Sequence, residues 1–125
     1  MKLLDDFCIA ELIAKEDNNY KIKLTLNSDH TIYKAHFPNN PITPGVCLLQ
    51  IAKEICQKFI YDNKKIIVSK CKNIKFLYPI NPLENAEIIY KIKTEQNLDS
   101  TSLTIEIIDK KQELIFTKMK ISITF

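Results

Sequence analysis

The chain has 125 residues, 46% hydrophobic and 26% charged, which is long enough for one domain with a sizeable core. The positive charge comes from lysine alone, spread along the chain, and the formal net charge is only +3, which argues against a nucleic-acid-binding module. No apolar run approaches the roughly 20 residues of a transmembrane helix. Acidic residues follow the first leucines at once, unlike in a signal peptide, so we expect a cytoplasmic protein without a membrane span.

Two strands are predicted near the start of the chain, over residues 8–16 and 20–27, where apolar residues alternate with polar ones. The Asp-Asn-Asn sequence at 17–19 is typical of a turn, so the two strands are expected to form a hairpin.

A long helix follows a loop rich in proline. Apolar residues recur at helical spacing from Val46 to about Tyr61, and they cover much of the girth of the predicted helix. We expect Thr43 to cap this helix and Pro44 to occupy its first position.

The second half of the chain predicts four further strands. They cover residues 65–78, 84–96, about 103–107 and 115–123. Strands broken by a single long helix indicate an α+β fold, in which an antiparallel sheet of five to six strands wraps around the helix. We expect residues 1–125 to form this single domain.

The cysteines lie among apolar neighbours and form no CxxC pair, so we interpret them as buried free thiols: Cys8, Cys47, Cys56 and Cys71. Zinc sites use paired ligand spacings that this chain lacks. We expect neither a metal ion nor another cofactor.

The only glycine of the chain, Gly45, follows three prolines spaced three residues apart. A glycine permits close approach to the backbone, and the start of a helix presents N–H groups that can stabilise negative charge on a carbonyl oxygen. Composition alone also fits a loop that only positions the helix.

Residues 36–46, which read HFPNNPITPGV, resemble the signature of the 3-hydroxyacyl-acyl carrier protein dehydratases. Residues 76–83, FLYPINPL, resemble the segment of that family in which a basic and aromatic strand meets a turn containing proline. The resemblance implies a hotdog fold, a homodimer or higher oligomer, and active sites in tunnels between subunits. Exposed edges of a small antiparallel sheet independently favour a dimer.

The resemblance also implies roles for single residues. His36 would be the general base that removes the proton α to the thioester carbonyl, a role that suits the pKa of histidine. The backbone N–H of Gly45 would polarise that carbonyl. His30 lies outside the motif and is expected at the surface. The residues expected to line the acyl tunnel are Phe37, Pro44, Val46 and Leu49.

The chain departs from the family at Gln50. The family places a carboxylate fourteen residues after the histidine, and it helps to expel the 3-hydroxyl group as water; glutamine has a similar size but exchanges no proton. Three readings stay open: Gln50 holds the substrate hydroxyl or a water in a slower dehydration, Glu54 reaches in one turn further along, or dehydration is lost and binding is kept.

Three functions therefore compete. The first is dehydration of 3-hydroxyacyl thioesters on acyl carrier protein, in fatty-acid or specialised acyl or polyene synthesis. The second is a non-catalytic subunit that binds the acyl carrier protein, or a heterodimer whose active relative supplies the carboxylate. The third, thioester hydrolysis, is disfavoured because no carboxylate lies at the predicted helix start. The expected partner is an acyl carrier protein with a phosphopantetheine-linked acyl chain, for which Lys72 and Lys75 are candidate contacts.

Overall fold

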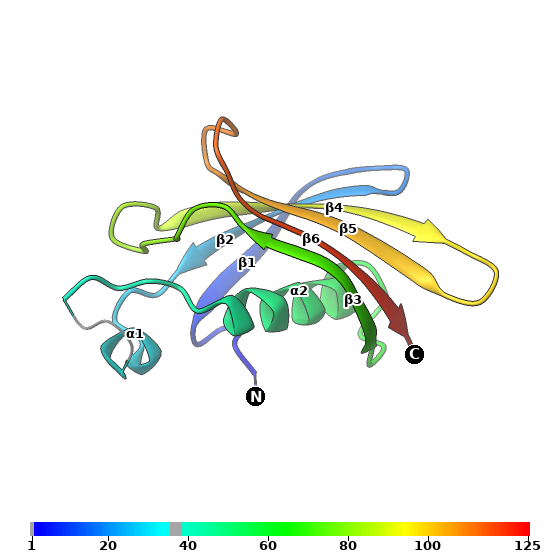
Figure 1. Ribbon diagram of the computed structural model, residues 1–125, viewed down its shortest axis with the longest axis horizontal. Coiled ribbons are helices and arrows are strands. Elements are labelled where there is room, and N and C mark those ends of the chain that lie inside the picture. Colours follow the sequence, from blue (N-terminus) through cyan, green and yellow to red (C-terminus); the bar gives the residue numbers. More distant parts are fainter. Residues whose placement is uncertain (1, 36–38) are drawn as a thin grey trace.

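The computed structural model describes residues 2–35 and 39–125 and contains two helices and six strands. Figure 1 shows the strands in one sheet and the long helix α2 beneath it. The elements, in chain order, are β1 (Cys8–Glu16), β2 (Asn19–Leu26), α1 (Thr31–Ala35), α2 (Gly45–Phe59), β3 (Ile67–Phe76), β4 (Glu87–Gln96), β5 (Thr101–Asp109) and β6 (Ile115–Thr124). The six strands and the one long helix that the sequence predicts are therefore confirmed.

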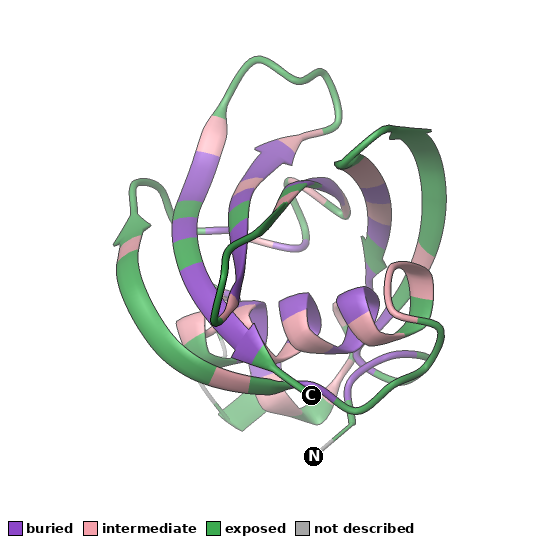
Figure 2. Cartoon of the chain, turned by 90° about the vertical axis from the view of Figure 1, so that its right-hand side faces the viewer, coloured by how far each residue is buried: buried purple, intermediate pink, exposed green. Residues whose placement is uncertain are grey.

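All six strands belong to one antiparallel sheet with the order β1-β2-β4-β5-β6-β3. This order places β1 and β3 at the two edges. Strand β3 interrupts its pairing with β6 at two register shifts, and such irregularities increase the local twist of a strand. Figure 2 shows the sheet curving over α2.

The core lies between the curved sheet and α2. The helix buries a broad apolar face, made of Cys47, Leu48, Ile51, Ala52, Ile55 and Cys56, because these residues recur at helical spacing. The inward residues of the strands, such as Ile105 and Ile121, are fully buried against it. A buried hydrogen bond of 2.9 Å, from the Tyr90 hydroxyl to the Leu48 carbonyl, ties the first turns of α2 to β4. The start of α2 is thus held at a fixed place on the sheet.

The predicted start of the helix is wrong in two details. Gly45, not Pro44, is the first helical residue, and Pro44 is the cap, with φ −62° and ψ 142° and no side-chain hydrogen bond. The hydroxyl of Thr43 does not cap the helix because it bonds the hydroxyl of Tyr33 at 2.9 Å. The sequence rule for helix caps assigns the Thr43 hydroxyl to the helix, but a tertiary contact with Tyr33, ten residues earlier in the chain, uses that hydroxyl instead.

The short helix α1 is not predicted by the sequence. Its five residues span little more than one turn, so they carry no readable periodicity. A side chain from outside the helix stabilises its start: His30 Nδ1 accepts a hydrogen bond from the N–H of Ile32 at 3.1 Å. Helix α1 leads directly into the segment that contains His36 and Phe37, which lies outside the described residues.

Candidate active site at the start of the long helix

The two segments that carry the family resemblance lie side by side. The N–H of Thr43, just before α2, donates to the carbonyl of Ile80 at 2.8 Å. Asn81 Nδ2 donates to Asn40 Oδ1 at 3.3 Å. Residues 76–83 therefore form one wall against the loop that leads into α2, although residues 47–75 separate the two segments in the chain.

The base of the loop that enters α2 is closed by a buried pair of hydroxyl groups. Tyr33 in α1 and Thr43 before α2 are 2% and 4% exposed, and their hydroxyls are 2.9 Å apart. The Tyr33 ring also stacks on Phe7, with ring centroids 5.0 Å apart. Burial raises the pKa of Tyr33 to about 12, so its hydroxyl stays protonated near neutral pH. The pair fixes where the chain leaves α1 and where it joins α2.

A hollow of about 410 Å³ opens at the start of α2 between these segments. Most of its wall is apolar, and the residues that line it are Ile42, Thr43, Pro44, Gly45, Leu48, Phe76, Leu77, Tyr78, Pro79, Ile80 and Thr117. A Cβ atom on Gly45 would lie only 2.6 Å from Phe76 Cζ, so any larger residue at this position would displace the Phe76 ring. The close approach that a lone glycine indicates is thus made by the ring of Phe76 at the mouth of the hollow.

The polar groups of this hollow include the first turn of α2. The earliest bonds of the helix run from the N–H groups of Cys47 and Leu48 to the Pro44 carbonyl, at 3.0 and 3.2 Å. The N–H groups of Gly45 and Val46 precede these bonds, in the positions where a helix has no intrahelical acceptor. The positive end of the helix dipole lies at the same place, so the hollow favours an oxygen that carries negative charge.

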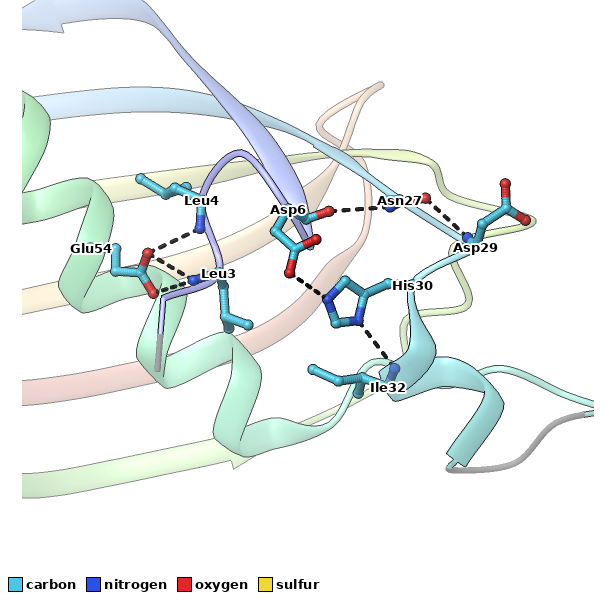
Figure 3. Close-up of polar contacts among 8 residues, drawn as sticks. All are labelled: Leu3, Leu4, Asp6, Asn27, Asp29, His30, Ile32 and Glu54. Atoms are coloured by element: carbon cyan, nitrogen blue, oxygen red, sulfur yellow. Dashed lines mark hydrogen bonds and ion pairs between the residues drawn. The ribbon is translucent and has the colours of Figure 1, made fainter.

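Gln50 lies further along α2 and makes a side-chain hydrogen bond with Glu54. Gln50 Nε2 donates to Glu54 Oε2 at 3.0 Å. The Glu54 carboxylate is 7% exposed and accepts the N–H groups of Leu3 and Leu4 at 2.9 to 3.0 Å, as Figure 3 shows. The Glu54 carboxylate is thus bound to the N-terminal backbone and to Gln50, which argues against the reading in which it reaches into the site.

The predicted tunnel residues fall beside two hollows rather than one. Pro44 and Gly45 line the first. Val46, Leu49 and Gln50 line a second hollow of about 320 Å³ between α2 and the start of β3. Together the two hollows follow α2 along the edge of the sheet that β3 forms.

His30, predicted at the surface, has a largely buried side chain that is only 12% exposed. Its Nδ1 accepts the N–H of Ile32, so the proton of the neutral ring lies on Nε2, which donates to Asp6 Oδ2 at 2.9 Å (Figure 3). The ring also meets the edge of Phe7, with centroids 5.2 Å apart. His30 is thus a structural residue that supports α1.

The cysteines are free thiols, as predicted, but only three of them are buried; Cys71 is exposed on β3. Burial raises the pKa of both Cys8 and Cys56 to about 12, which leaves them unreactive near neutral pH. In the part of the chain that the structure describes, no three His, Cys, Asp or Glu side chains gather as metal ligands. No helix of the described residues is long and apolar enough to cross a membrane.

The family model described as ApeI dehydratase matches residues 12–117. The chain belongs to the ApeI-like dehydratase family. A curated relative, the 3-hydroxyacyl-[acyl-carrier-protein] dehydratase FabZ of Wolbachia sp. subsp. Brugia malayi, is 29% identical over 86 residues. That match covers 61% of this chain and 59% of the relative, so it spans less than two thirds of the relative's length.

Solved structures agree on the fold. The dehydratase heterocomplex ApeI:P from Xenorhabdus doucetiae superposes with a TM-score of 0.72 at 17% identity, over 98% of this chain and 100% of that one. The thioesterase HI1161 from Haemophilus influenzae superposes with a TM-score of 0.61 at 11% identity, over 92% and 78%. At these identities the likeness shows the fold alone, the hotdog arrangement of an antiparallel sheet and a helix. A member of the ApeI-like family thus has the architecture that the sequence predicts.

Proposed function

We propose that this protein dehydrates 3-hydroxyacyl thioesters carried on acyl carrier protein to trans-2-enoyl thioesters, in the cytoplasm. One observation carries the proposal: both segments of the dehydratase resemblance meet at one apolar hollow, at the start of α2, where Gly45 presents its backbone. The membership in the ApeI-like family supports the reaction class. The chemistry needs no cofactor, because the thioester itself acidifies the α proton.

In the proposed reaction His36 removes a proton from the carbon next to the thioester carbonyl. The N–H of Gly45 polarises that carbonyl and stabilises the negative charge that develops on its oxygen. The C–O bond at carbon 3 then breaks as the double bond forms, and the hydroxyl leaves as water with the proton that His36 has taken. Phe37, Pro44, Val46 and Leu49 would contact the acyl chain.

Gln50 fits this reaction as a hydrogen-bonding group rather than as an acid. Glu54 accepts a hydrogen bond from the amide nitrogen of Gln50, because a carboxylate only accepts hydrogen bonds. In the proposed reaction the Gln50 side chain would form a hydrogen bond with the substrate hydroxyl and orient that hydroxyl for departure, without exchanging a proton. Losing one acid–base group slows such reactions by about 10²–10⁴-fold, so we expect slow turnover.

The site is proposed to be completed by a second subunit. Strand β3 lies at an edge of the sheet, and apolar side chains beside it are exposed: Val46 by 68%, Ile67 by 54% and Phe76 by 59%. Such an edge is covered when a second β3 pairs with it. The partner would be a second copy, and Lys72 and Lys75, both exposed on β3, remain weak candidates for contact with the carrier.

A second candidate is a subunit that binds the acyl carrier protein and works beside an active relative. Two observations favour it: Gln50 stands where the family has a carboxylate, and a solved structure with this fold is titled a dehydratase heterocomplex, ApeI:P. In such a pair the relative would supply the carboxylate and this chain would supply His36. Thioester hydrolysis lacks a carboxylate at the start of α2 to direct water.

The test is the conversion of a series of 3-hydroxyacyl carrier proteins to enoyl products, followed by the mass of the acyl chain. We expect slow turnover by the wild type, none by His36→Ala, and wild-type rates for Lys34→Ala, an exposed substitution on α1. Binding of the carrier without turnover, followed by turnover once an active relative is added, would support the second candidate instead. Neither binding nor turnover would refute both.

A further inference from the structure

Thr117 on β6 has a buried hydroxyl without a hydrogen-bond partner. The residue is 1% exposed, and its Oγ1 has no partner among the described residues. Among the described residues one other buried side-chain oxygen, Glu87 Oε2, also lacks a hydrogen bond, but it forms an ion pair with Lys110 Nζ at 3.3 Å. A buried hydroxyl without a hydrogen bond destabilises the fold, so an unbonded one is rare and calls for an explanation.

The position of Thr117 on the sheet points its side chain to the concave face. Strand β6 alternates, and the inward residues that follow Thr117 are Met119, Ile121 and Ile123, all buried in the core beneath the sheet. Thr117 is the only hydroxyl of this inward series, and it stands at the end of β6 that is nearest the start of α2, opposite Phe76 of β3. At the other three positions an apolar side chain fills the space.

Thr117 also lines the hollow of about 410 Å³ that Gly45 lines. The hydroxyl of Thr43, the other threonine that lines the hollow, is hydrogen-bonded to the hydroxyl of Tyr33 at 2.9 Å. The hollow therefore combines an apolar wall with the N–H groups at the start of α2, and its lining includes Thr117, whose unbonded hydroxyl solvent does not reach in the free protein. Donors that converge in an apolar pocket fit a ligand that has an oxygen acceptor within an apolar chain.

We propose that Thr117 is a binding residue for the acyl thioester, and that its hydroxyl donates to the thioester carbonyl oxygen that the helix start also holds. The inference rests on the proposed function, since it names a further contact of the same ligand. It explains why a threonine stands where valine would fill the same volume without an unbonded hydroxyl.

The test compares Thr117→Val and Thr117→Ser with the wild type in binding two compounds. One is a 3-hydroxyacyl pantetheine thioester, and the other is its thioether analogue, in which a methylene group replaces the carbonyl. We expect Thr117→Val to weaken binding of the thioester about tenfold and to leave binding of the thioether unchanged, as the loss of one hydrogen bond predicts. Thr117→Ser, which keeps the hydroxyl, should bind the thioester nearly as the wild type does.

Thermal unfolding of the free protein supplies a second readout. Because the Thr117 hydroxyl has no partner in the fold, Thr117→Val should unfold at the same temperature as the wild type or higher. The matched control Thr43→Val removes a bonded hydroxyl and should unfold at a lower temperature.

The assignment is overturned if Thr117→Val binds the thioester as tightly as the wild type, loses both compounds equally, or is destabilised as Thr43→Val is. A wild type that binds neither compound would refute the proposed function, and the assignment with it. A selective loss of the thioester in a stable Thr117→Val protein would support both.

Discussion

Replacing Gln50 by glutamate restores the residue type that the dehydratase resemblance leads us to expect, and it places a second carboxylate beside Glu54. In the present structure Gln50 Nε2 lies 3.0 Å from Glu54 Oε2. In Gln50→Glu an oxygen would take the place of that nitrogen. Two negative charges at this distance repel by roughly 1.4 kcal/mol in water and roughly 5.5 kcal/mol at an effective dielectric constant of 20. Gln50 is half-buried and Glu54 is buried, so we expect about 3 kcal/mol.

The repulsion raises the pKa of the introduced carboxyl group above its ordinary value of about 4.3. Below about pH 4.3 the carboxyl group at position 50 is neutral in both the folded and the unfolded chain, and it can donate a hydrogen bond to Glu54 as the amide does. As the pH rises, the unfolded chain releases this proton first, so the folded state is destabilised progressively until the pH has passed the raised pKa. Gln50→Glu should therefore resemble the wild type near about pH 4 and be less stable by about 3 kcal/mol at pH 8.

Urea denaturation between about pH 4 and pH 8, followed by circular dichroism, measures this difference. The matched control is the double variant Gln50→Glu with Glu54→Gln, which keeps one carboxylate and one amide and should lose the additional dependence on pH. Equal stability of Gln50→Glu and the wild type across this range would show that the two side chains do not meet, and would refute the geometry on which the argument depends.

Two further predictions concern the start of α2. Gly45→Ala places a methyl group 2.6 Å from the ring of Phe76 and should destabilise the protein by about 1 kcal/mol in thermal or urea unfolding. Adding Phe76→Ala should remove most of this destabilisation. A destabilisation that persists in the double variant would contradict the contact. Tyr33→Phe leaves the buried Thr43 hydroxyl without its partner and should also cost about 1 kcal/mol, whereas Tyr33→Phe combined with Thr43→Val should cost less than the sum of the two single changes.

The sheet could be predicted from the sequence because its strands bury one face. In the middle of β4, β5 and β6 buried residues alternate with more exposed ones, and this pattern is readable without knowledge of the fold. The bounds of strand β3 are harder to predict, since all of its residues are exposed or half-buried at the sheet edge. The predicted range of 65–78 was accordingly too long at both ends, where the structure has Ile67–Phe76.

The site could be predicted only where its signal is local. Gly45 and its prolines are such a signal, because a lone glycine in a stiff setting implies a close approach, which Phe76 makes. The role of Glu54 could not be predicted, because nothing local shows that Leu3 and Leu4 fold back to donate their N–H groups to it. Thr117 gave no signal at all, because a threonine in a strand is ordinary until the sheet places it over a hollow.

The proposed reaction needs two groups of residues, one that holds the thioester and one that expels the hydroxyl, and this chain supplies the first more fully than the second. The part that would hold the thioester, at the start of α2, is assembled from the chain itself: the helix start, the walls around Phe76 and the hydroxyl of Thr117 share one hollow. The part that would expel the hydroxyl has an amide at Gln50, bonded to a carboxylate that is bound to the N-terminal backbone. Binding should therefore tolerate changes that turnover does not. For this reason the same fold is compatible with a carrier-binding subunit and with a slow dehydratase. Measurements on Thr117 variants test thioester binding, and measurements on Gln50 variants test removal of the hydroxyl.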